Sequence, residues 1–122
     1  MSDRKKILVI DDEPQIRETL RELLTGADFD VIEAGTGQGG EKEILLGNPD
    51  MVILDLMLPG RSGEEVLAFI RGHKPTQNIP VIILSGRGTM TKKLACYLGG
   101  AVSFIDKPYD NVKLLKTVKK YI

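Results

Sequence analysis

The chain has 122 residues, with 17 basic and 17 acidic side chains and a formal net charge of zero. This length fits one hydrophobic core, and ordinary apolar and charged fractions argue against disorder. Charge balance gives no global reason to expect nucleic-acid binding. No segment approaches the roughly 18 apolar residues of a membrane span, and no signal peptide precedes the first apolar run. The single cysteine, Cys96, excludes an internal disulfide. We therefore expect a soluble cytoplasmic protein without a membrane partner.

Five short apolar runs alternate with longer amphipathic ones, a pattern typical of repeated βαβ units. The predicted strands cover Ile7 to Ile10, Asp30 to Glu33, Met51 to Leu54, Val81 to Leu84 and Val102 to Ile105. They are rich in Val, Ile and Leu without clean alternation, as expected for strands covered on both faces. The pattern predicts one α/β domain over residues 1–122, with a parallel sheet between helices.

The helices differ in how clearly the sequence defines them. In the first, Ile16, Leu20, Leu23 and Leu24 form one apolar stripe after Pro14 in the first turn. The third places Val66, Phe69 and Ile70 on one face. The fifth does the same with Val112, Leu115 and Val118, with Asp110 as its expected N-cap. Its lysines, Lys113, Lys116, Lys119 and Lys120, are interpreted as a solvated face.

Two helices are weakly defined. The second, around Gly39 to Leu46, begins in a glycine-rich run, and each interior glycine costs up to about 1 kcal/mol relative to alanine. We expect this helix to be short or mobile. The fourth, around Thr89 to Leu98, has a thin apolar stripe of Leu94, Tyr97 and Leu98. A weakly anchored helix of this kind is a candidate moving part.

Charged side chains follow the predicted strands at the points where the strands end. Asp11 and Asp12 follow the first strand, Asp55 follows the third, and Lys107 follows the fifth. Because the carboxyl ends of parallel strands meet at one edge of a sheet, we expect these side chains to converge. Three carboxylates supply hard oxygen ligands for Mg²⁺, and the cation can neutralise the oxygens of a phosphate donor. Two adjacent aspartates before a helix could alone be N-caps.

Phosphoryl transfer explains the remaining polar residues at this edge. Aspartate can act as a nucleophile toward phosphorus, which makes Asp55 a candidate acceptor of a phosphoryl group. Such transfer needs positioning and charge neutralisation, which a cation and Lys107 would supply. Ser85, at the end of the fourth strand, offers a hydroxyl for a phosphoryl oxygen.

Taken together in this order, the motifs resemble those of a response-regulator receiver domain of bacterial two-component signalling, over essentially the whole chain. They are the acidic pair Asp11 and Asp12, the segment D-x-M-x-P-G-x-x-G from Asp55 to Gly63, Ser85, Phe104 and the pair Lys107-Pro108. The resemblance implies a (βα)5 doubly wound, flavodoxin-like fold. Its five-stranded parallel sheet has the order 2-1-3-4-5, with helices on both faces.

The resemblance also implies roles for single residues. Asp11, Asp12, Asp55 and the backbone carbonyl of Met57 are expected to bind Mg²⁺, and Asp55 is expected to be phosphorylated. Lys107 is expected to pair with the phosphoryl group, while Ser85 moves toward it and Phe104 turns inward. The Lys107-Pro108 peptide is expected to be cis. Met57 and Arg87 flank the path of attacking water and are expected to lengthen the life of the phosphorylated form.

At the level of function, the resemblance implies a phosphorylation-dependent switch and not a metabolic enzyme. Such a switch is expected to catalyse its own phosphorylation and slow dephosphorylation. The expected partners are a sensor histidine kinase or phosphotransfer protein, and an output effector that contacts the fourth helix, fifth strand and fifth helix, without direct nucleic-acid binding. The expected state is a monomer or a phosphorylation-dependent dimer. Val102 and Ser103 stand where many family members carry acidic residues, which weakens the case for a dimer held by salt bridges on that face.

Three other functions fit the sequence less well. A phosphohydrolase of the haloacid dehalogenase type would need an acid two residues after the nucleophile, where this chain has Met57. A flavin-binding electron carrier would need a hydroxyl- and glycine-rich phosphate loop after the first strand, which is missing. A receiver-like scaffold that is never phosphorylated would not need the complete set of site residues.

Overall fold

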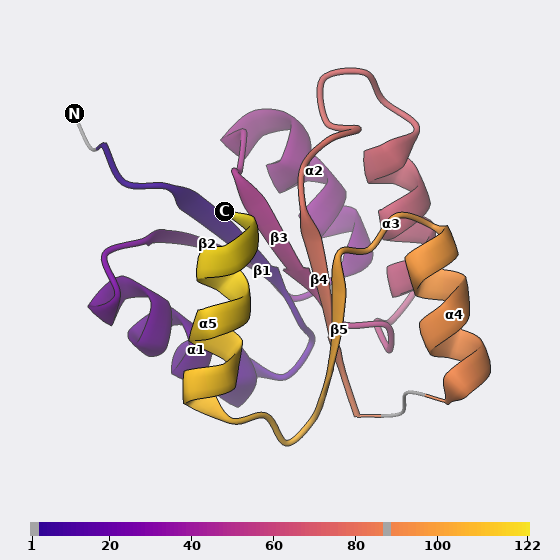
Figure 1. Ribbon diagram of the computed structural model, residues 1–122. Helices are drawn as coiled ribbons and strands as arrows, with labels where there is room; N and C mark the ends of the chain where they lie inside the picture. The colour runs from indigo at the N-terminus through magenta and orange to yellow at the C-terminus, as the bar shows by residue number, and fades with distance from the viewer. Residues whose placement is uncertain (1–2, 87–88) are drawn as a thin grey trace.

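The computed structural model describes residues 3–86 and 89–122, which alternate between strands and helices along the chain (Figure 1). The strands are β1 (Lys6–Ile10), β2 (Asp30–Ala34), β3 (Met51–Leu54), β4 (Val81–Ser85) and β5 (Ser103–Asp106). The helices are α1 (Pro14–Gly26), α2 (Gly37–Gly47), α3 (Gly63–Arg71), α4 (Met90–Leu98) and α5 (Asn111–Tyr121). The five predicted strands are therefore confirmed to within one residue at each end.

All strands are parallel and form one sheet in the order β2-β1-β3-β4-β5, which confirms the predicted topology. The strand order reverses direction between β1 and β3: β1 pairs with β2 on one side and with β3 on the other. In such a sheet the ligand site lies beyond the carboxyl ends of the strands at this reversal. The chain segments that follow β1 and β3 begin with Asp11 and Asp55, so both aspartates lie at that position.

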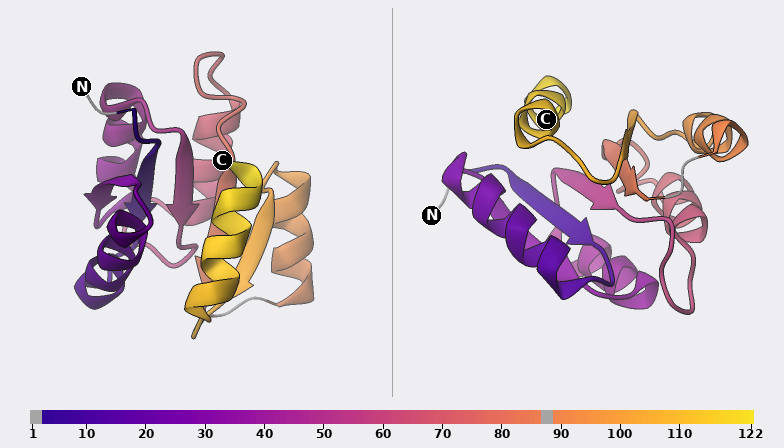
Figure 2. Two further views of the ribbon diagram at one scale, coloured as in Figure 1. Left: turned by 60° about the vertical axis from the view of Figure 1, so that its left-hand side comes forward. Right: turned by 90° about the horizontal axis from the view of Figure 1, so that it is seen from below.

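The helices cover both faces of the sheet, and alternate residues of each strand point to opposite faces. In β1, Leu8 and Ile10 pack into a core with α2, α3 and α4, whereas Ile7 and Val9 pack into a second core with α1 and α5. Figure 2 shows α2 and α5 on opposite sides of the strands. Among the described residues, no helix has the length and apolar character needed to cross a membrane.

The second helix is not short, contrary to the expectation from its glycines. It runs for 11 residues from an N-cap at Thr36, whose side chain accepts a hydrogen bond from the backbone N–H of Gly39. A Cβ atom at Gly37 would lie 2.6 Å from the backbone oxygen of Arg61, and one at Gly40 would lie 2.5 Å from Cδ1 of Ile10. These glycines therefore permit close packing of α2, and that packing offsets their poor helix propensity.

The faces of α4 and α5 differ from the predicted stripes. In α4 the only buried residue is Cys96, while Leu94, Tyr97 and Leu98 are 58%, 48% and 80% exposed. The apolar stripe predicted for this helix is thus on its outside. In α5 the buried residues are Leu114 and Val118; Val112 is 74% exposed, and the stripe is rotated by part of a turn. Asp110 is confirmed as the N-cap of α5.

Candidate phosphoryl-acceptor site

The sheet brings the predicted charged residues together at its carboxyl edge. The backbone N–H of Asp55 donates to the carbonyl of Ile10 at 2.9 Å, which places the segment after β3 directly beside that after β1. Both Asp11 and Asp55 are nearly inaccessible, at 2% and 4% exposed. Lys107 enters from the segment after β5, where its backbone N–H donates to the carbonyl of Ser85 at 2.9 Å. Residues nearly 100 positions apart thus share one small site.

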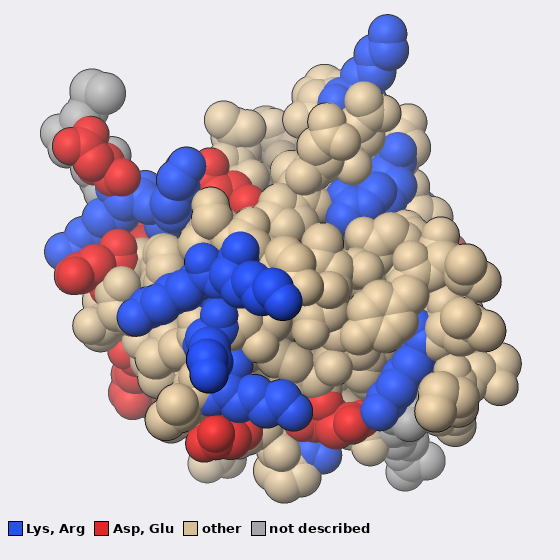
Figure 3. All heavy atoms as spheres, in the orientation of Figure 1, with Lys and Arg blue, Asp and Glu red and all other residues tan. Residues whose placement is uncertain are grey.

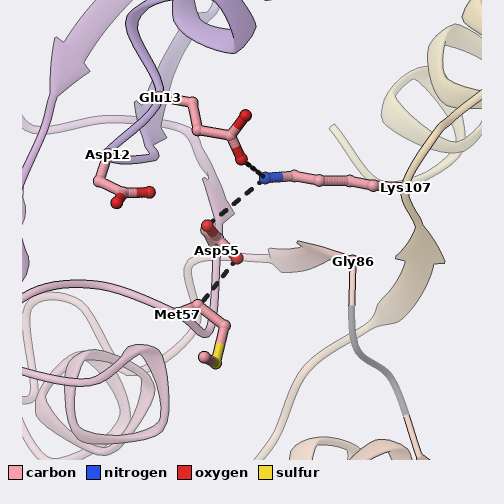
Figure 4. Close-up of a pocket in the computed structure, with 6 residues that line it drawn as sticks. All are labelled: Asp12, Glu13, Asp55, Met57, Gly86 and Lys107. Carbon is pink, nitrogen blue, oxygen red and sulfur yellow. Dashed lines mark hydrogen bonds and ion pairs between the residues drawn. The ribbon is translucent and has the colours of Figure 1, made fainter.

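Lys107 is the cation at the centre of this site. Its Nζ lies 2.7 Å from Oδ2 of Asp11, 3.4 Å from Oδ2 of Asp55 and 3.4 Å from Oε1 of Glu13. Figure 4 shows the lysine side chain reaching across the site toward Glu13 and Asp55. Because its side chain is only 13% exposed, the ammonium depends on these carboxylates to compensate for lost hydration.

Three carboxylates contact this ammonium, and that of Asp12 is the fourth member of the same cluster. Asp11, Asp12, Glu13 and Asp55 each offer one oxygen, and these oxygens lie within 4.8 Å of one another. Beside them is a pocket of about 410 Å³, lined by Asp12, Glu13, Asp55, Met57, Gly86 and Lys107 (Figure 4). The excess of negative charge and the hard oxygen donors suit a small divalent cation.

Glu13 was not identified from the sequence. It follows the aspartate pair directly, so the run of three acids after β1 was the signal that could have indicated it. In the structure it is the N-cap residue of α1, but its side chain makes no capping hydrogen bond. Instead the carboxylate faces Lys107, with 60% of the side chain exposed. The side chain of Glu13 therefore contributes to the site and does not cap the helix.

The pKa values of Asp55 and Lys107 reflect the shared environment. Burial raises the pKa of Asp55 above its ordinary value, and Asp11 adds to this increase, although Lys107 and the backbone N–H of Met57 oppose it. Burial acts to lower the pKa of Lys107, but the hydrogen bond and charge of Asp11, with the charges of Asp55 and Glu13, outweigh burial and raise it. The site is thus a crowded anionic cluster held together by one persistent cation.

Ser85 is buried at the end of β4, and its hydroxyl has no hydrogen-bond partner among the described residues. A buried hydroxyl without a partner is uncommon in folded proteins and calls for an explanation. The Lys107-Pro108 peptide is cis, as the resemblance implied. Phe104 is half-buried, with Nζ of Lys93 5.4 Å from its ring centre and its backbone N–H donating to the hydroxyl of Tyr97 at 3.1 Å.

Met57 and Arg87 are the two residues expected to control the access of water to the site. Met57 lies at the rim of the pocket, 53% exposed, and its side chain extends away from the carboxylates in Figure 4. Its backbone N–H donates to Oδ1 of Asp55 at 3.3 Å. Arg87 lies outside the residues that the structure describes, so its expected role stays a prediction.

Two further residues hold the backbone of the site in place. The guanidinium of Arg17, one turn into α1, donates to the carbonyl oxygen of Asp11 at 2.6 Å and pairs with Glu33 at 3.6 Å. Gly63, the first residue of α3, packs so closely that an added Cβ would overlap the carbonyl oxygen of Asp55 and lie 2.6 Å from Cα of Leu56. The turn that follows the candidate acceptor thus requires a residue without a side chain.

Comparison with known proteins gives consistent matches. Residues 7–119 match the family described as Response regulator receiver domain. The chain is 44% identical over 113 residues to the transcriptional regulatory protein KdpE of Mycobacterium tuberculosis, covering 93% of this chain and 49% of that protein. It is 35% identical over 115 residues to the phosphate regulon transcriptional regulatory protein PhoB of Pseudomonas aeruginosa, covering 94% and 50%. The chain thus spans about half the length of these curated relatives.

Solved structures of the same fold cover nearly the whole chain. The chemotaxis protein CheY4 of Vibrio cholerae superposes with a TM-score of 0.92 at 25% identity, covering 98% of this chain and 99% of that one. The beryllofluoride-activated receiver domain of Klebsiella pneumoniae RstA gives a TM-score of 0.89 at 27% identity, covering 96% and 97%.

Proposed function

Because the chain belongs to the response regulator receiver domain family, we propose that it is a signalling switch in which Asp55 accepts a phosphoryl group. Members of this family are signalling proteins and not metabolic enzymes. The observation that carries the proposal is the position of Asp55, which lies on the pocket wall beside an acidic cluster and within 3.4 Å of the Lys107 ammonium.

The donor set fits the divalent cation that receiver domains bind at an acidic pocket. We propose that Asp11, Asp12, Asp55 and the backbone carbonyl of Met57 hold Mg²⁺, all oxygen donors of the kind this ion prefers. When bound, the ion neutralises charge on the carboxylates and on the incoming phosphoryl oxygens. Glu13 belongs to the same carboxylate cluster. Its carboxylate can influence the site through its contact with Lys107 or through a water bound to the cation.

The proposed transfer step uses the Asp55 carboxylate as nucleophile. A carboxylate oxygen attacks the phosphorus of a phosphohistidine on a histidine kinase or phosphotransfer protein. The new O–P bond forms as the P–N bond breaks, and the imidazole leaves with the electron pair of that bond. In hydrolysis, water attacks the same phosphorus and regenerates the carboxylate and inorganic phosphate. The ammonium of Lys107 pairs with a phosphoryl oxygen. To do so, it gives up part of its contact with the Asp55 carboxylate.

The unsatisfied hydroxyl of Ser85 supports a link between phosphorylation and shape. We propose that this hydroxyl donates to a phosphoryl oxygen and that Phe104 turns inward as Ser85 moves, which changes the surface formed by α4, β5 and α5. That surface would contact the output effector, a partner protein or a further domain of a longer chain. Residues 1–122 would then form the receiver domain, a monomer or a phosphorylation-dependent dimer, with no direct nucleic-acid contact.

The decisive experiment is incubation with acetyl phosphate and Mg²⁺, followed by intact mass spectrometry. Wild type is expected to gain one phosphoryl group that is labile in base, and Asp55→Asn none. Asp106→Asn is the matched control, because Asp106 also ends a strand at this edge but pairs with Lys93 outside the pocket. Equal incorporation into wild type and Asp55→Asn would refute the assignment, and omission of Mg²⁺ tests the cation requirement.

A further inference from the structure

Two buried side-chain oxygens lack a hydrogen-bond partner among the described residues, and they belong to the hydroxyls of Ser85 and Tyr109. A buried tyrosine hydroxyl usually has a partner, because leaving it unpaired costs free energy. The proposed switch gives Ser85 a partner in the phosphoryl group, whereas Tyr109 has no role in it. Tyr109 follows Lys107 by two residues, so its hydroxyl is a second donor close in sequence to the cation of the site.

The ring of Tyr109 packs on the side of the sheet that α1 and α5 cover. Figure 3 shows blue side chains over α5, whose lysines are exposed, and the buried residues of this helix are Leu114 and Val118. The helix therefore directs its charges to solvent and offers the ring an apolar surface. A polar partner for the hydroxyl has to come from the carboxyl edge of the sheet.

Asp11 lies on the same side of the sheet as this ring. In β1, Ile7 and Val9 point to the side covered by α1 and α5, and successive residues of a strand alternate between the two faces. Asp11 continues this alternation, because its backbone N–H donates to the carbonyl of Ala34 at 3.1 Å and so extends the pairing of β1 with β2. The carboxylate of Asp11 and the hydroxyl of Tyr109 therefore share one side of the sheet at the same edge.

The pKa of Tyr109 reflects the charges of the site. Burial and the negative charge of Asp11 raise this pKa above its ordinary value, and the positive charge of Lys107 opposes the increase. The hydroxyl is thus within electrostatic reach of both side chains. It keeps its proton at neutral pH and is available as a hydrogen-bond donor.

The carboxylate of Asp11 depends on Lys107 for one of its two partners. Oδ1 accepts from the backbone N–H of Glu13 at 2.9 Å, and Oδ2 accepts from Nζ of Lys107 at 2.7 Å. In the proposed function the ammonium pairs with a phosphoryl oxygen on Asp55, and this movement takes it away from Asp11. Because Asp11 is only 2% exposed, bulk water cannot readily replace the lost donor, and an unpaired buried carboxylate oxygen is costly.

We propose that the hydroxyl of Tyr109 is the reserve donor for Asp11, and that it donates to Oδ2 when the ammonium of Lys107 turns to the phosphoryl group. Tyr109 is then a positioning residue that acts on the phosphorylated state through Asp11. An ionised carboxylate has about four lone-pair positions, so this hydrogen bond is compatible with the proposed binding of Mg²⁺ by Asp11. The trigger rests on the proposed function, whereas the exchange of donors requires only that Lys107 leaves Asp11.

The exchange gives the hydroxyl opposite effects in the two states. While Lys107 contacts Asp11, the unpaired hydroxyl destabilises the fold; after the exchange, its hydrogen bond to a buried carboxylate stabilises the new arrangement. Phenylalanine would keep the packing of the ring and remove only the donor. A purely structural role for Tyr109 would instead give Tyr109→Phe the same effect in both states.

A double-mutant cycle in chelator tests the exchange without a phosphoryl group or a metal ion. Lys107→Met removes the ammonium from Asp11 and keeps an apolar side chain at this position. In the chain with Lys107, Tyr109→Phe is expected to leave the folding equilibrium constant unchanged or to raise it a few-fold. With Lys107→Met, the same substitution removes the reserve hydrogen bond and is expected to lower that constant about tenfold. Urea titrations measure both effects, and Tyr121→Phe, at the C-terminal end of α5, is the control that should act equally in both backgrounds.

A spectroscopic measurement on the full chain reports the hydrogen bond itself. The tyrosines carry an NMR-active carbon isotope at Cζ, and the signal of Tyr109 is the one that Tyr109→Phe removes. Beryllofluoride with Mg²⁺ is expected to shift this signal, and metal-free Lys107→Met is expected to shift it in the same direction. Tyr109→Phe should also weaken beryllofluoride binding about tenfold, whereas Tyr121→Phe should not.

Equal effects of Tyr109→Phe in the two backgrounds would overturn the proposal, as would a Cζ signal that responds to neither condition. If Lys107→Met does not fold, the Cζ signal and the beryllofluoride affinity decide alone. Phosphorylation of Asp55 is measured separately. A chain that is not phosphorylated but shows the predicted cycle would refute the switch and retain the reserve donor, so the two failures are distinguishable.

Discussion

Asp12 offers the sharpest test of the crowded carboxylate site, because among residues 3–86 and 89–122 its side chain has no hydrogen bond or ion pair that its removal would break. Replacement by alanine removes one of four carboxylates whose oxygens lie within 4.8 Å of one another. At this distance two charges in a water-like dielectric repel by about 1 kcal/mol. Three carboxylate neighbours, partly offset by Lys107, give a repulsion of about 2 kcal/mol on Asp12.

Two effects reduce this repulsion. Physiological salt screens it substantially over such a distance, and Asp11 and Glu13 remain neighbours of Asp12 in the unfolded chain. The net gain in the free energy of unfolding is therefore about 1 kcal/mol, and for a domain of this size the melting temperature should rise by about 3 °C without Mg²⁺. With saturating Mg²⁺ the order should reverse, because ligand binding stabilises wild type more than the variant.

Differential scanning calorimetry with chelator and with Mg²⁺ measures both effects. Asp3→Ala is the control, since it removes the same charge from the exposed N-terminal segment. Asp11→Ala should instead lower the melting temperature, because the Asp11 carboxylate accepts hydrogen bonds from the backbone N–H of Glu13 and from Lys107. A lower melting temperature for Asp12→Ala without Mg²⁺ would refute the repulsion argument and show that the Asp12 side chain stabilises the metal-free fold.

Four further substitutions test separate parts of the site. Lys107→Ala should leave Mg²⁺ affinity equal or higher, yet slow phosphorylation and reduce the amide-shift response to beryllofluoride; a full wild-type response would contradict this role. Glu13→Gln should speed phosphorylation by acetyl phosphate a few-fold, because Lys107 loses a competing partner; unchanged rates would show that Glu13 is a bystander. Met57→Ala should shorten the phosphoprotein lifetime roughly fivefold, measured as decay after donor removal at constant Mg²⁺; an unchanged or longer lifetime would exclude shielding. Gly63→Ala should lower the free energy of unfolding by about 2 kcal/mol in urea titrations, since the new methyl group meets backbone atoms; wild-type stability would show that the turn can relax.

The sequence predicts the sheet well, and it also predicts that Asp11, Asp12, Asp55 and Lys107 lie together, because both features depend on strong local signals. Continuous apolar runs define buried strands, and the charged residues that follow them converge by topology alone. Lys107 and Asp11 form an ion pair across 96 positions, yet each is marked only by its place after a strand. The run of three acids after β1 indicates Glu13 only weakly, because a carboxylate at a helix start has the same local sequence whether it faces solvent or a distant lysine.

Helix faces were predicted less well, for physical reasons that are visible in the packing. The glycines of α2 have poor helix propensity, but the cost is offset by close contact with Ile10 and Arg61, neither of which is near in sequence. In α4, helical spacing identifies a stripe without saying whether it faces the sheet or the solvent. Leu94 and Leu98 have the character of core residues, and only the tertiary structure shows that Cys96 takes that position.

The sparse burial of α4 also determines how easily its arrangement can change. Most of its apolar surface is already in contact with water, so displacing the helix exposes little more and is opposed mainly by Cys96 and the contacts of Lys93 and Tyr97 with β5. A hydrogen bond to a charged group contributes about 1.5–3 kcal/mol, enough to change the population ratio of two arrangements by roughly ten- to a hundredfold. For α1, with Leu20 and Leu24 fully buried, the same free energy would leave the displaced arrangement rare. Amide hydrogen exchange should therefore be fastest in α4 among the helices, and it should be the helix whose exchange changes most when beryllofluoride binds.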